Sequence, residues 1–418
     1  MQWIYGLADM QSFYASCEVA SRSEFAAQRQ EDNDDSDPAL VVAGDPQRRT
    51  GIILAATPPA KRLGVNTAMT LGDALRLAPD LIVVRPRMGF YLQVSIRIQL
   101  LMKQFFPLQE QFSIDEGFFA FPWPSDLFPD PLQVAQELRQ AIWDQFHIRC
   151  RIGLSYNKWM AKMANNAAKK SPYRVTWWQE DDVLDKLQTL SVFDMWGLKK
   201  RAQVLHDEFQ VETIGDVANL SIPLLRHRFG VWGEIIHRWS TGHDFSPINP
   251  NAYHQPHKGL SHRITLPRDY EERDDIKVVI LELLDEVTWR VRVAGQRGRR
   301  VGLGVTYAGF SGGFYRTKSL SDYTQDTSVL YPEVLSILDQ YWNGSRVRAI
   351  AVVLDMLQSA TSIQLSFFDQ VQKREQLIQT VDELRLRFGE ASVMRAVSLT
   401  KAGQLRDRSK KIGGHYRE

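Results

Sequence analysis

The first 175 residues alternate between short apolar runs, which predict strands, and segments with amphipathic spacing, which predict helices. We expect strands at 3–8, 39–44, 51–57, 81–86 and 148–156, and helices at 12–20, 91–106, 131–146 and 157–170. A proline opens the helix expected at 131–146, where its fixed φ angle suits the first turn. Strands interleaved with helices indicate an α/β or α+β domain.

The rest of the chain changes character twice. Residues 183–245 show mostly helical spacing and predict a small all-helical domain. The stretch "SPINPNAYHQP" at 246–256 has the Pro and Asn content of a linker. Beyond it, the pattern follows a β-α-β-β-α-β order, which is typical of a small α/β sandwich. The predicted parts are 1–175, 176–245 (helical), 246–256 (linker), 257–357 (sandwich) and 358–418 (tail).

Composition narrows the class of protein. With 418 residues, 44% hydrophobic and 24% charged, the chain is expected to be globular with several domains. Its net charge of +2 means that any basic surface must come from local segregation. Two cysteines argue for a reducing compartment, and the N-terminus lacks the basic region of a signal peptide. No apolar run approaches the roughly 18 residues that span a bilayer, so we expect a cytoplasmic protein without a membrane partner.

The stretch "QFSIDEGFFAF" at 111–121 places two adjacent acids, Asp115 and Glu116, in an apolar run. A desolvated carboxylate is costly unless it is compensated, so the pair alone favours a turn or a hairpin tip. Asp9 ends the first predicted strand. If the strands that carry these acids are neighbours, three carboxylates converge at one sheet edge. Such a site suits Mg²⁺, and two ions there can activate an attacking oxygen and stabilise a leaving one.

Two motifs carry a family resemblance. The segments "LADMQSFYASCE" (7–18) and "FSIDEGFFAF" (112–121) resemble the signature motifs of Y-family DNA polymerases, the UmuC/DinB translesion group, and their separation also fits. The resemblance covers nearly the whole chain and is closest to UmuC-like repair polymerases of Gram-positive bacteria. It implies a multidomain α+β right-hand polymerase, with a palm, small fingers at about 15–85, an all-helical thumb and an α/β-sandwich little finger.

The resemblance also implies an activity and its partners. The expected reaction is error-prone translesion synthesis, in which two Mg²⁺ ions, or Mn²⁺ in their place, assist nucleotidyl transfer from a dNTP to the primer 3′-hydroxyl. Asp9, Asp115, Glu116 and the backbone carbonyl of Met10 would hold the metals. The implied partners are primer–template DNA, dNTP and the bacterial sliding clamp, with a recombinase filament or accessory SOS proteins as further candidates. The protein would associate with the nucleoid during repair.

For the nucleotide, Tyr14 matches the aromatic steric gate that excludes a ribose 2′-hydroxyl, although a core aromatic is the simpler interpretation of that position alone. The chain departs from the Y-x-x-R pattern of many relatives, because Pro58 replaces the tyrosine and Lys61 the arginine. Lysine keeps a point charge without the bidentate fork. The candidate nucleotide contacts are Phe13, Tyr14, Thr57, Lys61, Arg62 and Lys169, the last of which is otherwise a solvated lysine at a helix end.

Two basic segments are candidates for DNA contacts. The segment "RVRVAGQRGRR" (290–300) has no acid and is expected to open a strand that follows phosphates, unless it is merely a solvated face. The helical domain resembles a helix-hairpin-helix, but its "GLKKRA" lacks the usual glycine pair, so charge would have to substitute. The predicted DNA contacts are Arg290, Arg292, Arg297, Arg299 and Arg300 in the first segment, and Lys199, Lys200 and Arg201 in the second.

The pentapeptide "QLSFF" (364–368) resembles a clamp-binding peptide, with a strand packed on its own domain as the alternative. Leu365, Phe367 and Phe368 would fill an apolar pocket, and Gln364 would hydrogen-bond at its rim. Two other functions compete with the polymerase. One is a non-catalytic clamp- and DNA-binding factor at stalled forks, against which the complete set of acids argues. The other is a palm-fold nucleotidyl cyclase, which the basic segment and the clamp-like peptide disfavour.

Overall fold

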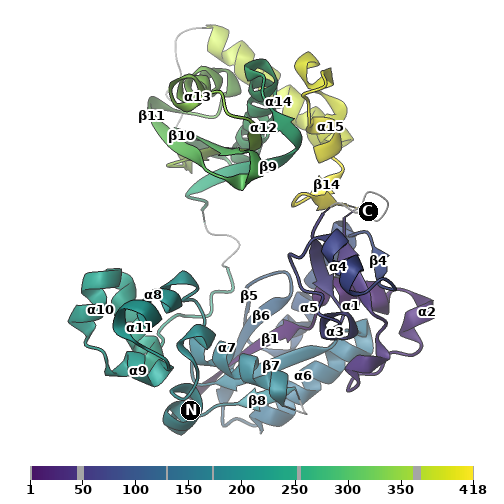
Figure 1. Cartoon of the computed structure of the whole chain (residues 1–418), viewed down its shortest axis with the longest axis vertical. Helices are drawn as coiled ribbons and strands as arrows, with labels where there is room; N and C mark the ends of the chain where they lie inside the picture. The colour runs from purple at the N-terminus through teal and green to yellow at the C-terminus, as the bar shows by residue number, and fades with distance from the viewer. Residues whose placement is uncertain are drawn as a thin grey trace. The chain divides into compact units, whose positions relative to one another are not determined.

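The computed structural model describes residues 2–44, 51–128, 130–171, 174–251, 256–360 and 369–417. The chain divides into two compact units, 1–254 and 255–416, which Figure 1 shows in purple to teal and in green to yellow. The boundary between the units falls inside the stretch expected to be a linker.

The first unit is built on a five-stranded sheet with the strand order β5-β6-β1-β7-β8. Its strands are β1 (Gln2–Met10), β5 (Leu108–Gln111), β6 (Glu116–Trp123), β7 (Cys150–Ser155) and β8 (Val175–Trp177). The central strand β1 runs antiparallel to both β6 and β7, and the register places Asp9 opposite Glu116 on one side and Arg151 on the other. The sequence that ends β1 therefore faces two neighbours at once.

Three helices pack around this sheet: α5 (Met88–Phe105), α6 (Pro131–Phe146) and α7 (Lys158–Ala167). Helix α7 lies directly on β7. The approach is so close that a Cβ atom at Gly153 would come within 2.0 Å of the backbone nitrogen of Asn165. Trp159, Met160 and Met163 fill the buried face of α7. The glycine in the strand is thus what allows the helix and its side chains to approach the sheet edge that carries Asp9.

A second, three-stranded sheet has the order β3-β2-β4 and forms its own small core. It comprises β2 (Leu40–Ala43), β3 (Ile53–Ala56) and β4 (Ile82–Val84), with α1 (Phe13–Ala20), α2 (Ser23–Ala26), α3 (Pro58–Arg62) and α4 (Leu71–Leu77) nearby in the chain. Strand β3 ends at Ala56, and Pro58 and Pro59 occupy the first turn of α3. The alternating pattern predicted these strands, but did not separate them from the larger sheet.

The helical segment that follows contains α8 (Lys200–Phe209), α9 (Ile214–Asn219), α10 (Ile222–Phe229) and α11 (Val231–Ser240). Its core includes Leu205, Leu225 and Ile236 and continues into Trp159 and Met163 of α7. The helical prediction for this part of the chain agrees with the structure.

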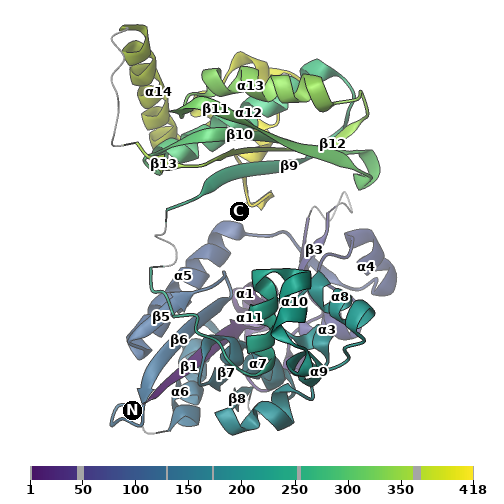
Figure 2. The same cartoon turned by 90° about the vertical axis from the view of Figure 1, so that its left-hand side faces the viewer.

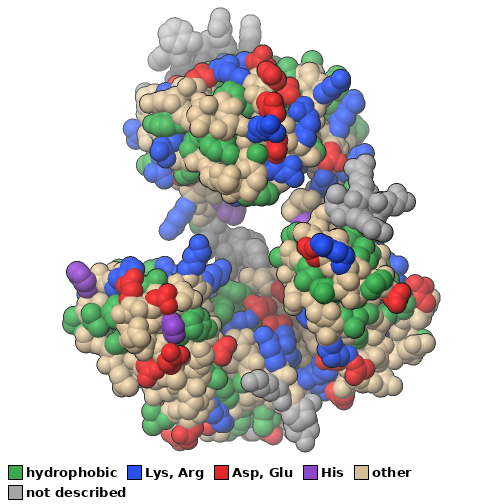
Figure 3. All heavy atoms as spheres, viewed as in Figure 1, with side chains coloured by type: hydrophobic (Ala, Val, Ile, Leu, Met, Phe, Trp, Pro, Cys, Tyr) green, Lys and Arg blue, Asp and Glu red, His purple; other side chains and the backbone are tan. Residues whose placement is uncertain are grey.

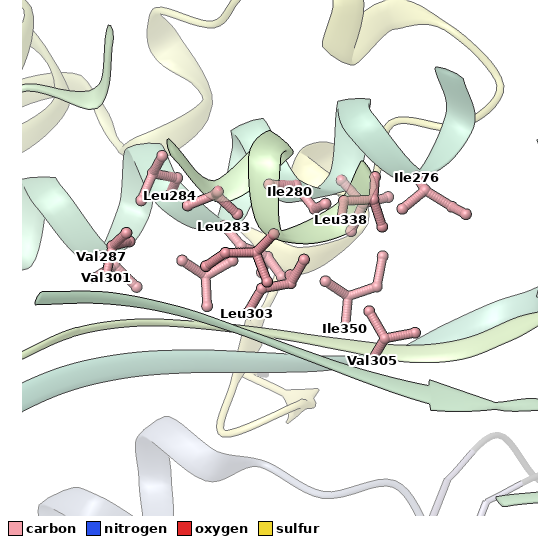
Figure 4. Packing of buried hydrophobic residues seen from close by; sticks show 14 of the residues in the cluster. Ile276, Ile280, Leu283, Leu284, Val287, Val301, Leu303, Val305, Leu338 and Ile350 are labelled. Carbon is pink, nitrogen blue, oxygen red and sulfur yellow. The ribbon is translucent and has the colours of Figure 1, made fainter. Parts of the chain in front are cut away.

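The second unit is a four-stranded antiparallel sheet of order β11-β10-β12-β9, with α12 and α13 on one face (Figure 2). In chain order its elements are β9 (Gly259–Tyr270), α12 (Arg273–Val293), β10 (Gln296–Tyr307), β11 (Gly313–Thr324), α13 (Thr327–Tyr341), β12 (Val347–Asp355) and β13 (Gln358–Ser359). Apart from the short β13, this is the expected β-α-β-β-α-β order. Figure 4 shows Leu283 of α12, Leu303 and Val305 of β10 and Leu338 of α13 packed together between helices and sheet.

One expectation about this unit is wrong. The basic segment 290–300 does not simply open a strand, because Arg290 and Arg292 lie in the last turn of α12 and β10 begins at Gln296. The helical spacing of the apolar residues extends α12 into the arginine-rich segment, where the arginines alone had suggested a strand.

The tail from Asp369 to Tyr416 belongs to the second unit. It contains α14 (Asp369–Phe388), α15 (Leu405–Arg408), β14 (Lys411–Ile412) and β15 (His415–Tyr416). Tyr270 donates its hydroxyl proton to the backbone oxygen of Ala402 at 2.9 Å, and the backbone N–H of Gln404 donates to Glu282 Oε2 at 2.8 Å. Both contacts are buried, so the tail completes the core of this unit.

Among the helices of the described residues, none combines the length and the apolar character that crossing a membrane requires.

Candidate active site

The topology of the first unit brings Asp9, Asp115 and Glu116 to one end of the larger sheet. Asp9 and Glu116 are paired across β1 and β6, and Asp115 lies in the turn that joins β5 to β6. The backbone N–H of Met10 donates to the backbone oxygen of Asp115 at 2.8 Å. The turn expected from the pair of acids and the sheet edge expected from Asp9 are therefore the same place.

Two cations that the sequence reasoning missed lie among these acids. Arg151 of β7 donates from Nη2 to Asp9 Oδ1 at 3.1 Å. Lys162 of α7 donates to Glu116 Oε1, and its Nζ is 3.8 Å from Asp9 Oδ2. The Lys162 side chain is only 8% exposed. A lysine on the otherwise apolar face of the "WMAKMA" helix is the sequence signal that could have identified it.

The pKa values of Asp115 and Glu116 are raised where the three acids come together. Burial raises the pKa of Asp115, the charge of Asp9 raises it further, and a hydrogen bond from Ser113 Oγ at 2.6 Å opposes the shift. Burial also raises the pKa of Glu116, where Lys162 opposes the shift and the charge of Asp9 adds to it. Bringing further positive charge to this sheet edge would lower the pKa of both carboxyls.

The donor set at the sheet edge fits a divalent cation. Three carboxylates and the backbone carbonyl of Met10 provide the hard oxygen ligands that Mg²⁺ prefers. Across the described parts of the chain, however, no three His, Cys, Asp or Glu side chains already stand in a metal-holding arrangement. The Asp115 carboxylate accepts from Ser113, while Asp9 and Glu116 face Arg151 and Lys162. The chemistry of the residues thus fits a metal, while their side chains stand in an internally paired arrangement.

Tyr14 lies beside the acids rather than in the core. Its ring stacks on Tyr91 of α5, with the centroids 4.7 Å apart and the planes at 18°. Burial raises the pKa of Tyr14, and the charge of Asp115 raises it further, which places the two groups within electrostatic reach. Its neighbour Phe13 is buried, at 3% exposure.

The contacts of Tyr91, the residue on which Tyr14 stacks, explain the role of Glu18 in the first motif. Tyr91 donates its hydroxyl proton to Glu18 Oε1 at 2.6 Å, and Arg87 donates to both carboxylate oxygens of Glu18 at 2.9 Å. Glu18 is completely buried. The motif glutamate is therefore a structural anchor for the aromatic stack, and neither Tyr91 nor Arg87 was identified from the sequence.

The predicted phosphate contacts separate into different environments. Lys61 donates from Nζ to Ser12 Oγ at 2.8 Å; desolvation lowers the pKa of Lys61, nearby Arg151 lowers it further, and Asp9 raises it. Arg62 is paired with Asp35 instead. Thr57 is buried, and its hydroxyl donates to the backbone oxygen of Pro38 at 2.7 Å.

The hydroxyl of Thr57 is therefore committed to the small sheet, where it also accepts from the backbone N–H of Leu40 at 3.0 Å. This contradicts the expectation that Thr57 offers its hydroxyl to a phosphate. Lys169 is exposed and lines a cavity of about 200 Å³ together with Arg151 and Arg174. Figure 3 shows blue and red side chains next to one another on the face of the first unit between its helical segment and its small sheet.

The basic residues of the second unit do not form one row. Arg292 pairs with Asp382 of the tail at 2.5 Å, Arg297 with Glu375 at 3.1 Å, and Arg300 with Asp355 at 2.8 Å. Arg290 donates to the backbone oxygen of Ser261 at 3.2 Å, and the exposed Arg299 donates to that of Leu320 at 3.1 Å. Their predicted contacts with DNA stay a prediction.

In the helical segment, Lys199 precedes α8 with a φ of 47°, and Arg201 lies over the ring of Trp232 at 4.3 Å. A second helical hairpin joins α10 to α11 through Gly230, whose φ is 62°, and the sequence reasoning did not single it out. Lys200 is the first residue of α8. The clamp-like peptide, with Gln364, Leu365, Phe367 and Phe368, lies outside the described residues.

Comparison with known proteins gives matches over the whole chain. The sequence model of the impB/mucB/samB family matches residues 8–166, and that of its C-terminal domain matches residues 257–367. A protein of Halalkalibacterium halodurans named DNA polymerase IV 2 is 37% identical over 422 aligned residues, and the alignment covers 100% of both chains. DNA polymerase IV 2 of Bacillus subtilis is 35% identical with 98% of both chains covered.

A further relative is the putative UV-damage repair protein UvrX of Bacillus subtilis, 30% identical over 97% of this chain and 96% of that protein. Among solved structures, a Y-family DNA polymerase chimera is similar with a TM-score of 0.68 over 85% of this chain and 99% of that chain. At 20% sequence identity, this structural likeness bears on the fold alone.

Proposed function

The chain belongs to the impB/mucB/samB family of Y-family, UmuC/DinB-type DNA polymerases, and from this premise we propose that it extends primers past damaged template bases by error-prone, two-metal-ion nucleotidyl transfer. It is a DNA-directed DNA polymerase. In the proposed division of labour, the five-stranded sheet is the palm, the small sheet the fingers, α8–α11 the thumb and the second unit the little finger.

The observation that supports the metal mechanism is the pairing of Asp9 with Glu116 across β1 and β6, with Asp115 in the adjoining turn. These three carboxylates, with the Met10 carbonyl, would hold two Mg²⁺ or Mn²⁺ ions. Cations held by these residues would supply positive charge for the attacking primer oxygen and the leaving phosphate oxygen. Lys162 keeps Glu116 and Asp9 together at the sheet edge by pairing with both.

The remaining parts of the site act on the incoming dNTP. Tyr14, held flat by its stack on Tyr91, is proposed to close the space that a ribose 2′-hydroxyl would need. Lys61 and Lys169 are proposed to bind the triphosphate as point charges. The charges of Arg151 and Lys169 both act on the pKa of Lys61, so the three cations lie within electrostatic range of this site. Because Thr57 and Arg62 are engaged elsewhere, the fingers contribute fewer phosphate contacts than the sequence suggested.

The proposal extends to partners. Primer–template DNA and dNTP are the substrates, and Arg299 of β10 together with Lys199, Lys200 and Arg201 of the thumb are the candidate backbone contacts that keep charge available. The peptide 364–368 is proposed to bind the sliding clamp, and recombinase or accessory SOS proteins remain candidate partners. The proposed place of action is the cytoplasm, at the nucleoid.

Primer extension with Mg²⁺ tests the proposal, on undamaged templates and on templates that carry a lesion. The double variant Asp115→Ala/Glu116→Ala should lose extension by about 10³-fold or more, because the charge that positions the cations is gone. Asp181→Ala/Asp182→Ala, an adjacent pair of acids in a short 3₁₀ helix of the same unit, is the matched control and should retain extension.

Extension that survives the first double substitution would rule out the metal assignment. A wild-type protein that binds primer–template DNA but extends no primer under any condition would favour the non-catalytic factor instead.

A further inference from the structure

The cavity of about 200 Å³ beside the proposed triphosphate site holds an arginine that neither the sequence motifs nor the mechanism uses. Arg174 precedes β8 and lines this cavity with Arg151 and Lys169. Its φ of 56° is in the left-handed region, which is unfavourable for a residue with a long side chain. The backbone oxygen of Arg174 accepts from the N–H of Ile152 at 2.9 Å, so the strained conformation is fixed by the sheet.

The guanidinium of Arg174 is neutralised by the protein itself. Its Nη2 donates to Asp34 Oδ1 at 2.9 Å, and its Nη1 donates to Gln11 Oε1. Gln11 in turn donates from Nε2 to Asp34 Oδ2 at 3.1 Å. Because Gln11 follows Met10 directly, this triad lies at the end of β1, two residues beyond the proposed metal ligand Asp9.

The acid-rich loop that carries Asp34 is anchored, so Asp34 reaches Arg174 from a defined position. Arg149, whose side chain is 1% exposed, donates to the backbone oxygens of Gln30 and Asn33 at 2.6 and 2.8 Å. It also pairs with the buried Asp37 at 2.6 Å. In contrast to these buried groups, the Asp34 side chain is 32% exposed and borders the cavity.

The charges around the cavity suit a polyanion better than a single carboxylate. Arg151 and Lys169 line it with Arg174, and Lys61 is within electrostatic range of both Arg151 and Lys169. Nε of Arg151 is buried without a hydrogen-bond partner. A triphosphate offers several charged oxygens to these donors, whereas Asp34 satisfies Arg174 and repels any second anion that enters.

We propose that Asp34 is an internal counterion of the nucleotide site: it occupies Arg174 in the free protein, and Arg174 exchanges it for the triphosphate of the incoming dNTP. This inference rests on the proposed function and deepens it. Arg174 is then a nucleotide-binding residue. Asp34 lowers the affinity for dNTP that the basic side chains of the cavity would otherwise give. The exchange is non-covalent and replaces one charge-assisted pair by another.

A mutant cycle tests the inference through dNTP binding, measured by calorimetry on a complex with a primer that ends in a dideoxynucleotide, so that no turnover occurs. Asp34→Asn should lower the Kd for the templated dNTP by about 3- to 10-fold, since a competing charge is removed. Arg174→Asn, which suits the left-handed backbone, should raise the Kd by about 10-fold. In the Arg174→Asn background, Asp34→Asn should have a clearly smaller effect, because only the direct repulsion between Asp34 and the triphosphate then remains.

Asp35→Asn is the matched control. Asp35 is adjacent to Asp34 in the sequence, but it pairs with Arg62, and neither residue lines the cavity. The Kd of this variant for dNTP should equal that of the wild type. Thermal unfolding verifies that each variant is folded; Asp34→Ser replaces Asp34→Asn if the latter is not. An unchanged or raised Kd in the folded Asp34 variant would overturn the inference, as would equal tightening with and without Arg174. If the wild type binds no dNTP, the proposed function fails, and the inference fails with it.

Discussion

Charged residues behave in opposite ways in the two units. In the first unit, side chains that are far apart in the sequence meet at one sheet edge: Asp9, Asp115, Glu116, Arg151 and Lys162. In the second unit, five arginines within 290–300 are neighbours in the sequence but find five separate partners. Density of charge along the chain was therefore a poorer guide to a site than the pairing of strands.

The backbone explains this difference. β1 lies at the centre of its sheet, so Asp9 near its end has a partner strand on each side, and Lys162 of α7 lies beside it. The arginine segment instead passes from a helix, where successive residues are rotated by about 100°, into a strand, where they alternate. A register irregularity between Gly298 and Arg300 spreads the side chains further.

The largest expected effect concerns Tyr14 of the first unit, whose role depends on residues that are distant in the sequence and meet in the fold. Tyr14→Ala should raise ribonucleotide insertion relative to deoxyribonucleotide insertion by about 100-fold, because the ring no longer fills the space for a 2′-hydroxyl. Single-nucleotide insertion kinetics measure this ratio. Tyr315→Ala, an exposed tyrosine of the second unit, should leave it unchanged. Unaltered sugar discrimination in Tyr14→Ala would refute the gate.

The next effect tests whether the arginines of the second unit act separately. Arg292 and Asp382 are 12% and 13% exposed, so removing either leaves a largely buried charge. Arg292→Ala and Asp382→Ala should each lower the free energy of unfolding by about 2 kcal/mol, and the double variant by little more than either alone. Denaturant titration provides the values. Arg346→Ala, from an exposed pair with Glu271, is the control and should change stability by less than about 0.5 kcal/mol.

A smaller effect is expected for the exposed Arg299. Arg299→Ala should weaken binding to primer–template DNA by about 2- to 5-fold and reduce the salt dependence by about one ion. Arg292→Ala should leave the salt dependence as it is, since its charge is used by Asp382. Fluorescence anisotropy at several salt concentrations distinguishes the two. Equal salt dependences for both variants would break the comparison, because the arginines would then act as one surface.

The smallest effect concerns the electrostatic cost at the sheet edge. Since burial raises the pKa of Asp115 above its unfolded value, the protonated carboxyl is favoured in the folded state. Its contribution to stability is complete below the unfolded pKa and is lost as the pH rises through the folded pKa.

In metal-free buffer at pH 7, Asp115→Asn should therefore raise the Tm by about 1–3 °C, and the gain should shrink as the pH falls toward about 4. Ser113→Ala, which removes the hydrogen bond that opposes the shift, should have the opposite sign. A gain in Tm that grows on acidification would contradict the assigned cause.

Much of this was predictable from local pattern. The apolar runs and helical spacing gave most elements of the first unit and the β-α-β-β-α-β order of the second, because those signals depend on nearby residues. The acids at 9, 115 and 116 were found from their motifs. Lys162, Arg151 and Tyr91 were missed, since their relevance arises only when β7, α7 and α5 are packed against β1 and α1.

Other features depended on tertiary structure that a local pattern does not contain. The split into two sheets is set by which strands pair, and the docking of the tail by contacts such as Gln404 with Glu282. The small residue Gly117 likewise depends on tertiary packing. A Cβ atom at this position would lie 2.8 Å from Gln99 Oε1 and 3.0 Å from Met102 Cε of α5, so a larger residue there would require these side chains to shift.

The central claim is that carboxylates brought together from distant positions hold divalent cations. Mn²⁺ binding, counted by electron paramagnetic resonance in the presence of dNTP and a dideoxy-terminated primer–template, tests it most directly. The account predicts about two Mn²⁺ ions per wild-type protein and fewer than one in Asp9→Asn/Glu116→Gln, with DNA binding retained. The same number of bound ions in the wild type and the variant would contradict it.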